Sequence, residues 1–130
     1  MKNIVVRNTS QTPIYQQLFD QISSQIINGE IGADQPLPSM RTIAKELRVS
    51  IITIKKTWEL LEADGFIYTV KGKGSYVKSN SKSSLLKKKK NAVKNILQDS
   101  LRDCKEYELT KTELIEIVEE LYDQMNESND

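Results

Sequence analysis

Apolar residues near the N-terminus recur at helical spacing. They stand at every fourth position, at Ile14, Leu18, Ile22 and Ile26. This period predicts an amphipathic helix with one face turned toward a core. Thr12 is a candidate N-cap with Pro13 at the first helical position, and Asn28-Gly29 supplies a stop signal. Ahead of the helix, residues 4–6 (Ile-Val-Val) are typical of a short strand.

Two shorter helices are predicted after a connecting loop at residues 29–38, which holds two of the five Gly and two of the three Pro. Ser39 is a candidate N-cap for the first helix and Ser50 for the second. Their apolar positions are Ile43, Ala44 and Leu47 in one helix and Ile54, Trp58 and Leu61 in the other. Asp64-Gly65 ends the second helix. Two short helices joined by about three residues match the helix-turn-helix pattern.

Beyond Gly65 the hydrophobic period changes from helical to alternating. Residues 66–70 and 75–77 are rich in β-forming side chains and are predicted strands. Residues 71–74 (Lys-Gly-Lys-Gly) form a turn sequence between them, since glycine tolerates positive φ. Three helices followed by a hairpin with a basic tip describe a winged helix. Residues 1–78 are therefore predicted to form an α+β winged helix-turn-helix domain.

The last third of the chain predicts a separate helical tail. Residues 79–91 are a Ser/Lys-rich linker and helix start, and their lysine run at 87–90 is interpreted as solvated, with nonspecific electrostatic attraction. Residues 92–130 predict a two-helix hairpin, with capping-box spacing between Thr110 and Glu113. So small a hairpin completes its core either against another copy of the chain or on the first domain. The positions predicted for dimerisation are Leu97, Leu101, Leu114, Val118, Leu121, Tyr122 and Met125.

Composition removes several classes of protein. The 130 residues are 38% hydrophobic and 28% charged, which is typical of a soluble globular protein. No apolar stretch is long enough for a membrane span, and the N-terminus lacks a signal-peptide core, so a cytoplasmic location is expected. One Cys and no His exclude an intrachain disulfide and a zinc site. With no phosphate-binding loop and no nucleophile–base pair, we expect no cofactor and no enzyme.

The net charge of +1 conceals two opposite halves. Residues 1–94 contain 16 Lys+Arg and 7 Asp+Glu, whereas residues 95–130 contain 3 and 11. The asymmetry indicates a basic module that meets a polyanion, followed by an acidic module with another task. A soluble protein whose charges merely segregate is the alternative.

Four short motifs together resemble the GntR family of bacterial transcription regulators. They are Pro13-Ile14-Tyr15-Gln16-Gln17, Leu37-Pro38-Ser39-Met40-Arg41, Val49-Ser50 with Thr53, and Gly72-Lys73-Gly74-Ser75-Tyr76-Val77. The resemblance covers residues 12–78, and the short helical tail is similar to the YtrA-like subfamily. It implies a dimeric, DNA-binding repressor, often of a transporter operon near its own gene. Small-molecule effectors are compatible with the resemblance, but no convergent polar cluster in the sequence marks a pocket.

The chain departs from the family pattern at four positions. Arg48 stands where the family usually has Gly, and Asp34 where Gly is common. Ile51 and Ile52 replace the Arg or other polar residue that often follows Ser50.

The candidate DNA-binding residues fall at two helix N-termini and at the hairpin tip. Ser39 and Ser50 are interpreted either as N-caps alone or as caps that also contact phosphate. Arg41 is a cation in a first helical turn, which favours a nearby anion over an ordinary surface arginine. The hairpin tip, Lys71, Gly72 and Lys73, either approaches DNA or forms a solvated turn. We expect it to lie against the sugar-phosphate backbone of the DNA beside the minor groove.

The start of the third helix is predicted to enter the major groove. Thr53 is expected to contact a base or a phosphate, and Lys55 a phosphate or guanine. Ile51 and Ile52 either pack on thymine methyl groups or fold back onto the core.

These features together predict a homodimeric regulator that binds a palindromic operator in double-stranded DNA. A protein–protein adaptor built on a winged-helix scaffold is the alternative, because a fold does not determine a function. Arg41 and the hairpin lysines argue against the adaptor, which has no need of them.

Overall fold

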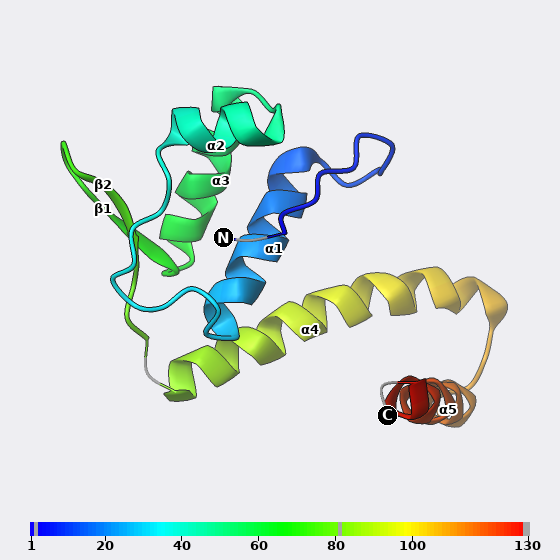
Figure 1. The fold of residues 1–130 in the computed structure, drawn as a ribbon. Helices are drawn as coiled ribbons and strands as arrows, with labels where there is room; N and C mark the ends of the chain where they lie inside the picture. The colour runs from blue at the N-terminus through cyan, green and yellow to red at the C-terminus, as the bar shows by residue number, and fades with distance from the viewer. Residues whose placement is uncertain (2, 81, 129–130) are drawn as a thin grey trace. The chain divides into compact units, whose positions relative to one another are not determined.

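The computed structural model describes residues 1, 3–80 and 82–128. The chain divides into two compact units, Met1–Lys89 and Lys90–Asp130. Its elements in chain order are α1 (Ile14–Ile27), α2 (Met40–Leu47), α3 (Ile51–Ala63), β1 (Ile67–Val70), β2 (Gly74–Val77), α4 (Lys82–Cys104), a 3₁₀ turn (Lys105–Tyr107) and α5 (Lys111–Ser128) (Figure 1). The predicted α+β winged helix-turn-helix fold, followed by C-terminal helices, is confirmed.

The core of the first unit lies between α1 and α3. Leu18 and Ile22 of α1, and Ile54 and Leu61 of α3, are fully buried. Trp58 is a core residue, as predicted, with 3% of its surface exposed. The hairpin closes the core with Ile67 and Val77, which face each other across the antiparallel pair, and both are buried. The helical period of four therefore gives each helix one buried face.

The two predicted serine caps are confirmed. The Ser39 side-chain oxygen accepts a hydrogen bond from the Thr42 amide, and that of Ser50 from the Thr53 amide, each at 3.1 Å. Each bond satisfies one of the N–H groups that have no partner within the helix, and so sets where the helix begins.

Two departures from the family pattern lie where the backbone is left-handed. Arg48 caps the C-terminus of α2 with φ 56°, and Asp34 has φ 62° in the preceding loop. A side chain at such a position costs about 1–2 kcal/mol, which glycine avoids. The glycine that the resemblance implies at these positions would avoid this strain, which this chain tolerates at both places.

The N-terminal end of α1 differs from the prediction. Pro13, and not Thr12, is the N-cap, and the helix begins one residue later, at Ile14. The Pro13 carbonyl accepts from the amides of Gln16 and Gln17, both at 3.1 Å. The Thr12 carbonyl instead accepts from the Gln17 side chain at 2.8 Å, which draws residue 12 out of the helix.

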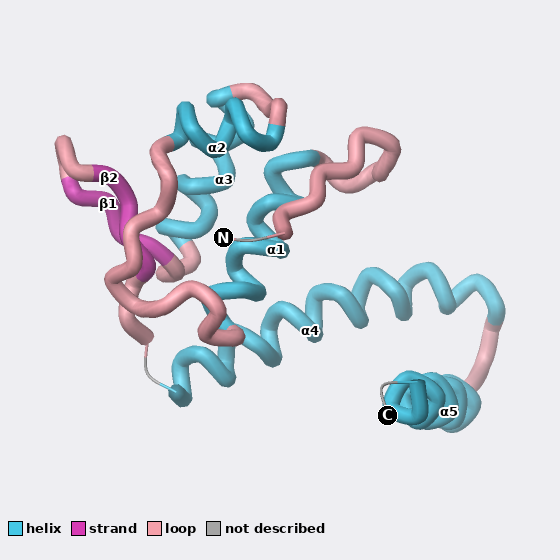
Figure 2. The backbone as a smooth tube through the Cα atoms, viewed as in Figure 1, coloured by secondary structure: helices cyan, strands magenta, loops and turns pink. Residues whose placement is uncertain are grey.

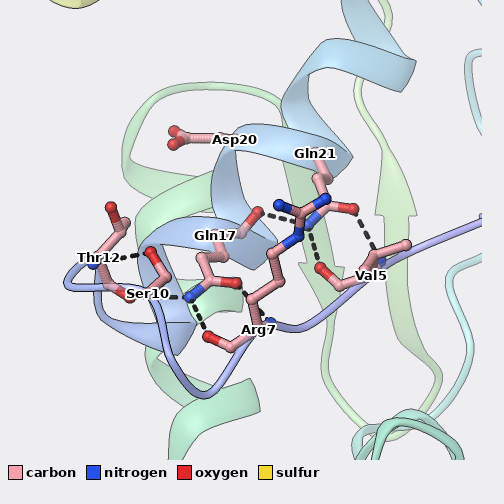
Figure 3. A pocket seen from close by; sticks show the side chains of 7 residues that line it. All are labelled: Val5, Arg7, Ser10, Thr12, Gln17, Asp20 and Gln21. Atoms are coloured by element: carbon pink, nitrogen blue, oxygen red, sulfur yellow. Dashed lines mark hydrogen bonds between the residues drawn. The ribbon is translucent and has the colours of Figure 1, made fainter.

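The strand predicted at residues 4–6 is not formed. The backbone of Val5 pairs instead with the side-chain amide of Gln21, through hydrogen bonds of 2.9 and 2.7 Å (Figure 3). Arg7 pairs in the same way with Gln17, at 2.9 and 3.0 Å. Toward the segment, each glutamine amide uses one N–H as donor and its carbonyl oxygen as acceptor, as a peptide group of a neighbouring strand would. The segment is therefore fastened to α1 by side chains.

The loop at residues 29–38 is more than a connection. The Asp34 amide donates to the Val77 carbonyl at 2.8 Å, and the Val77 amide donates to Gln35 at 3.0 Å. The Leu37 amide donates to Ser75 at 2.9 Å. This part of the loop follows β2 on the side away from β1 (Figure 2). It satisfies the edge that β2 would otherwise expose, and it anchors the wing.

The interpretation of the lysine run as wholly solvated is wrong for Lys88. Its ammonium donates to the Asp64 carbonyl at the end of α3 and lies 4.7 Å from the centre of the Phe66 ring. A cation suits the negative end of a helix, and an aromatic face attracts it further. Phe66 itself precedes β1 and is buried, although it was predicted as part of the strand.

The second unit leaves most of its apolar side chains exposed. Apart from Leu114, which is half-buried, every α5 side chain that the structure describes is exposed. The exposed apolar residues of this unit are Val93, Ile96, Leu97, Leu101, Tyr107, Leu109, Ile115, Ile117, Val118, Leu121, Tyr122 and Met125. The predicted capping box is confirmed, since Thr110 and Glu113 exchange hydrogen bonds of 3.0 and 3.2 Å.

Leu61→Ala should lower the free energy of unfolding by about 2–5 kcal/mol, because it leaves a cavity in the core. Ile52→Ala is the matched control on the same helix. It should change stability by no more than about 0.5 kcal/mol, since 79% of Ile52 is exposed. Urea unfolding followed by the fluorescence of the single tryptophan measures both. A similar loss in the two variants would contradict this account of the core.

Candidate nucleic-acid interface

The outer face of α3 is exposed at its N-terminal end. Ile51 and Ile52 are its first two residues, with 48% and 79% of their surfaces exposed. Lys55 follows on the same side and is exposed, whereas Ile54 and Trp58 face the core. Of the two interpretations of the isoleucine pair, packing on the core does not hold for Ile52, and Ile51 is half exposed.

At the start of α2, and again at the start of α3, the serine hydroxyl is hydrogen-bonded to the hydroxyl of a threonine three residues later. Ser50 Oγ lies 2.8 Å from Thr53 Oγ1, and Ser39 Oγ donates to Thr42 Oγ1 at 2.7 Å. Each serine thus acts as a cap, in agreement with one of its two interpretations. Ser39 and Ser50 are also exposed. Because a hydroxyl has one proton, Ser39 Oγ can donate to a phosphate oxygen only when it gives up its bond to Thr42, whereas Ser50 Oγ is free to donate when Thr53 is the donor of their pair.

Arg41 lies at the second position of α2 and is exposed. The described first turns of α2 and of α3 carry no carboxylate. The N-terminal end of a helix dipole is positive, and Arg41 adds to that charge instead of compensating it. This end of the domain is therefore suited to an external anion.

The wing tip is basic and exposed. Lys71, Gly72 and Lys73 form the turn, which the Lys73 amide closes by donating to the Val70 carbonyl at 2.9 Å. Gly72 has φ 78°, a conformation that strains a residue with a side chain. Nothing lies within 4 Å of where its Cβ would be, so glycine also leaves room for a close approach to the backbone.

An aromatic pair on the wing was not predicted. Tyr68 and Tyr76 face each other in the strand register and stack with ring centres 5.5 Å apart. The Tyr68 hydroxyl donates to Asp34 at 2.8 Å. This hydrogen bond is the main cause that raises the pKa of Tyr68, since it favours the neutral phenol. The signal in the sequence was the alternation of the hairpin, which puts two tyrosines on one face.

A second contact missed by the sequence involves Lys56. Its ammonium lies 3.8 Å from the centre of the Tyr15 ring of α1. The contact is a cation–π interaction between helices that are neighbours only in the folded domain. It directs Lys56 toward α1, whereas Lys55, which is exposed, makes no such ring contact within the described residues.

The ten predicted DNA-binding residues lie on three elements of one unit. Ser39 and Arg41 are at the start of α2, Ser50, Ile51, Ile52, Thr53 and Lys55 at the start of α3, and Lys71, Gly72 and Lys73 at the wing tip. The residues predicted for dimerisation all belong to the other unit.

A shallow hollow of about 370 Å³ lies between the N-terminal segment and α1 (Figure 3). Its lining includes Arg7 and Asp20, both exposed, and the two glutamines that hold the segment. The glutamine amides are already paired with backbone groups. The glutamine amides in the lining are therefore not free to bind a small polar molecule in the hollow.

Within residues 1, 3–80 and 82–128, no three His, Cys, Asp or Glu side chains gather where they could hold a metal ion. None of the helices described is long and apolar enough to cross a membrane.

A helix-turn-helix followed by an anchored wing defines the winged-helix class of DNA-binding proteins. Comparison with known proteins specifies the family. Residues 14–77 match the family described as "Bacterial regulatory proteins, gntR family". The chain belongs to the GntR family and is a DNA-binding regulator.

Relatives of known sequence agree with this assignment. The HTH-type transcriptional repressor YtrA of Bacillus subtilis is 32% identical over 95 residues, which span 73% of either chain. The HTH-type transcriptional repressor NagR of the same organism is 38% identical over 72 residues. Those residues are 55% of this chain and only 30% of NagR, so the likeness to NagR is confined to part of that protein.

Solved structures show the same fold. A GntR family transcriptional regulator from Listeria monocytogenes superimposes with a TM-score of 0.71 at 27% identity, covering 85% of this chain and 96% of that one. The DNA-binding domain of AraR, solved in complex with operator ORX1, has a TM-score of 0.52 at 31% identity. That match covers 58% of this chain and 94% of the AraR chain.

Asp34→Asn should lower the pKa of Tyr68 toward its ordinary value of 10.0. Asparagine tolerates the left-handed backbone at this position but lacks the charge that holds the phenol proton. In the native protein, the contribution to stability is fully present below pH 10 and is lost as the pH rises through the raised pKa of Tyr68. NMR of tyrosine labelled with ¹³C at Cζ measures the titration. An unchanged pKa in the variant would show that Asp34 is not the cause.

Proposed function

We propose that this protein is a homodimeric transcriptional repressor that binds a palindromic operator. The observation that carries the proposal is the exposed N-terminal half of α3, with Lys55 on its outer face, which lies in the same unit as Arg41 and the wing lysines. Duplex DNA is a dense polyanion whose major groove admits one helix, and this surface suits both properties.

Each part of the surface has a distinct role in the proposal. The amides and hydroxyls at Ser39 and Ser50 bind phosphate and set the docking angle of the helix-turn-helix. Arg41 contacts DNA from the start of α2. Thr53 and Lys55 contact the major groove or its phosphates, and the wing tip lies against the backbone beside the minor groove.

The helical tail joins two copies in this proposal. Its support is the row of exposed apolar side chains on α4 and α5, from Leu97 to Met125, which no other described part of the second unit covers. Burial of apolar surface is the dominant favourable term in protein association. The acidic charge of residues 95–130 repels DNA, and so keeps the paired tails off the duplex.

Two-fold symmetry of the dimer leads to a palindromic operator, with half-sites about one or two helical turns apart. Repression is proposed because YtrA, which resembles this chain along most of its length, is named a repressor. Control of a transporter operon near its own gene is proposed from the resemblance to the YtrA-like subfamily, and a small-molecule effector is compatible with the proposal.

The adaptor alternative predicts different behaviour toward DNA. An adaptor would bind duplexes weakly, if at all, and without sequence preference. Selection of bound fragments from random and genomic DNA by the full-length protein distinguishes the two functions. A reproducible palindromic motif supports the repressor, whereas fragments without a common motif contradict it.

Arg41→Ala should lower the affinity for the selected operator by about 1–3 kcal/mol. Lys73→Ala should instead reduce the slope of log affinity against log salt by about one, because it removes one phosphate contact. Lys111→Ala, on the tail, is the control and should change neither quantity. Fluorescence anisotropy at several salt concentrations measures both. A slope near zero for the native protein would contradict electrostatic binding.

Leu121→Glu should shift the tail from dimer toward monomer and weaken operator binding, because it puts a charge into the proposed apolar interface. Glu120→Gln changes the neighbouring residue and should leave the dimer intact. Sedimentation velocity measures the mass, and a gel-shift titration measures operator binding. A native protein that is monomeric at micromolar concentration, or a Leu121→Glu variant that stays dimeric, would contradict pairing through this face.

A further inference from the structure

The start of the recognition helix carries two exposed isoleucines, which is unusual for a surface that meets a polyanion. With 79% of its surface exposed, Ile52 contributes little to the core of its own domain. Ile51 is 48% exposed and lies beside it at the first helical position. An exposed apolar pair at this place marks a candidate contact surface. Its position at the start of α3 limits the kind of partner that can cover it.

Polar groups in the same turn are largely committed to the helix itself. The Ser50 hydroxyl accepts the Thr53 amide at 3.1 Å, and the two hydroxyls lie 2.8 Å apart. Few side-chain donors or acceptors of this turn are therefore left to recognise base edges by hydrogen bonding. Among the first four residues of α3, Ile51 and Ile52 are exposed, whereas Thr53 is half-buried and Ile54 is buried.

We propose that Ile52, assisted by Ile51, recognises thymine methyl groups in the major groove of the operator. The inference rests on the proposed function, since it needs the helix in that groove. The edges of the four bases there present donors and acceptors, and thymine alone adds an apolar group, its C5-methyl. A base without this methyl group gives isoleucine no apolar contact in its place, and that lost contact is the source of the discrimination.

The neighbours of the pair confine this recognition to the first turns of α3. Lys55 lies about one turn beyond Ile51 and Ile52 and is exposed, so it can meet a phosphate or guanine next to the thymine. Lys56 is directed toward Tyr15 of α1. Glu59, one turn later, is exposed and acidic, and it disfavours close approach to phosphates farther along the helix. We therefore expect one or two thymines in each half-site.

The test removes single methyl groups from the DNA. Operator duplexes selected by the full-length protein are synthesised with deoxyuridine in place of each thymidine in turn, which deletes only the C5-methyl. At one or two positions per half-site, the substitution should weaken binding by about threefold to tenfold, as expected for one buried methyl group. Uracil at the remaining positions should leave the affinity unchanged within twofold.

Ile52→Ala connects the effect to the protein. This variant should bind the thymine operator more weakly, and the penalty for uracil at the critical position should fall to nearly onefold. Lys55→Gln is the matched control on the same face. It should weaken binding to both duplexes equally and keep the full uracil penalty, because it removes a charge and no methyl contact.

The outcomes separate this inference from the proposed function. Specific operator binding without a uracil penalty at any position overturns methyl recognition and leaves the repressor intact. A penalty that persists in both Ile52→Ala and Ile51→Ala also overturns it, since another group must then contact the methyl. Failure to select any common DNA motif overturns the proposed function, and the inference with it.

Discussion

Burial of one face of α3 is the interaction on which the rest of the molecule depends. Ile54, Trp58 and Leu61 occupy that face and pack with Leu18 of α1 and the other core residues. A helix that buries one face must present the opposite one to solvent, because its side chains radiate around a single axis. The hydrophobic core thus also orients the start of α3 outward. Stability and the proposed DNA contact come from the same helix.

Helix capping and strand pairing fix which side chains the first unit presents to solvent. The serine caps set the first residue of α2 and of α3, and so decide which side chains lie in each first turn. Strand β2 of the wing is held on both sides, by its pairing with β1 and by the loop that carries Asp34 and Leu37. A two-stranded hairpin alone is marginally stable in water, so this third partner is what makes the wing a firm element of the surface.

The two units differ in their charge and in how much of their apolar surface they bury. The first unit buries a conventional core and concentrates positive charge, whereas the second exposes apolar side chains among acidic ones. An amphipathic helix with no packing partner gains little stability from its apolar face. The second unit therefore has most to gain from association, and its negative charge makes another protein surface a better partner than nucleic acid.

The sequence alone determined the features that depend on neighbouring residues. Helical and alternating periods, the Ser39 and Ser50 caps, the Thr110 capping box and the glycine turn all arise within a few positions of the chain, and they sufficed for the fold class and the candidate surface. The exposure of Ile52 could not be predicted from the sequence, because the hydrophobic period and the apolar side chain suit a core position as well as a contact surface. Only tertiary structure decided that exposure, the position of Lys88 on Phe66, and the glutamine pairing with the N-terminal segment. The two contacts join groups distant in sequence, which folding alone brings within range, and the exposure of Ile52 depends on which other parts of the chain pack against α3.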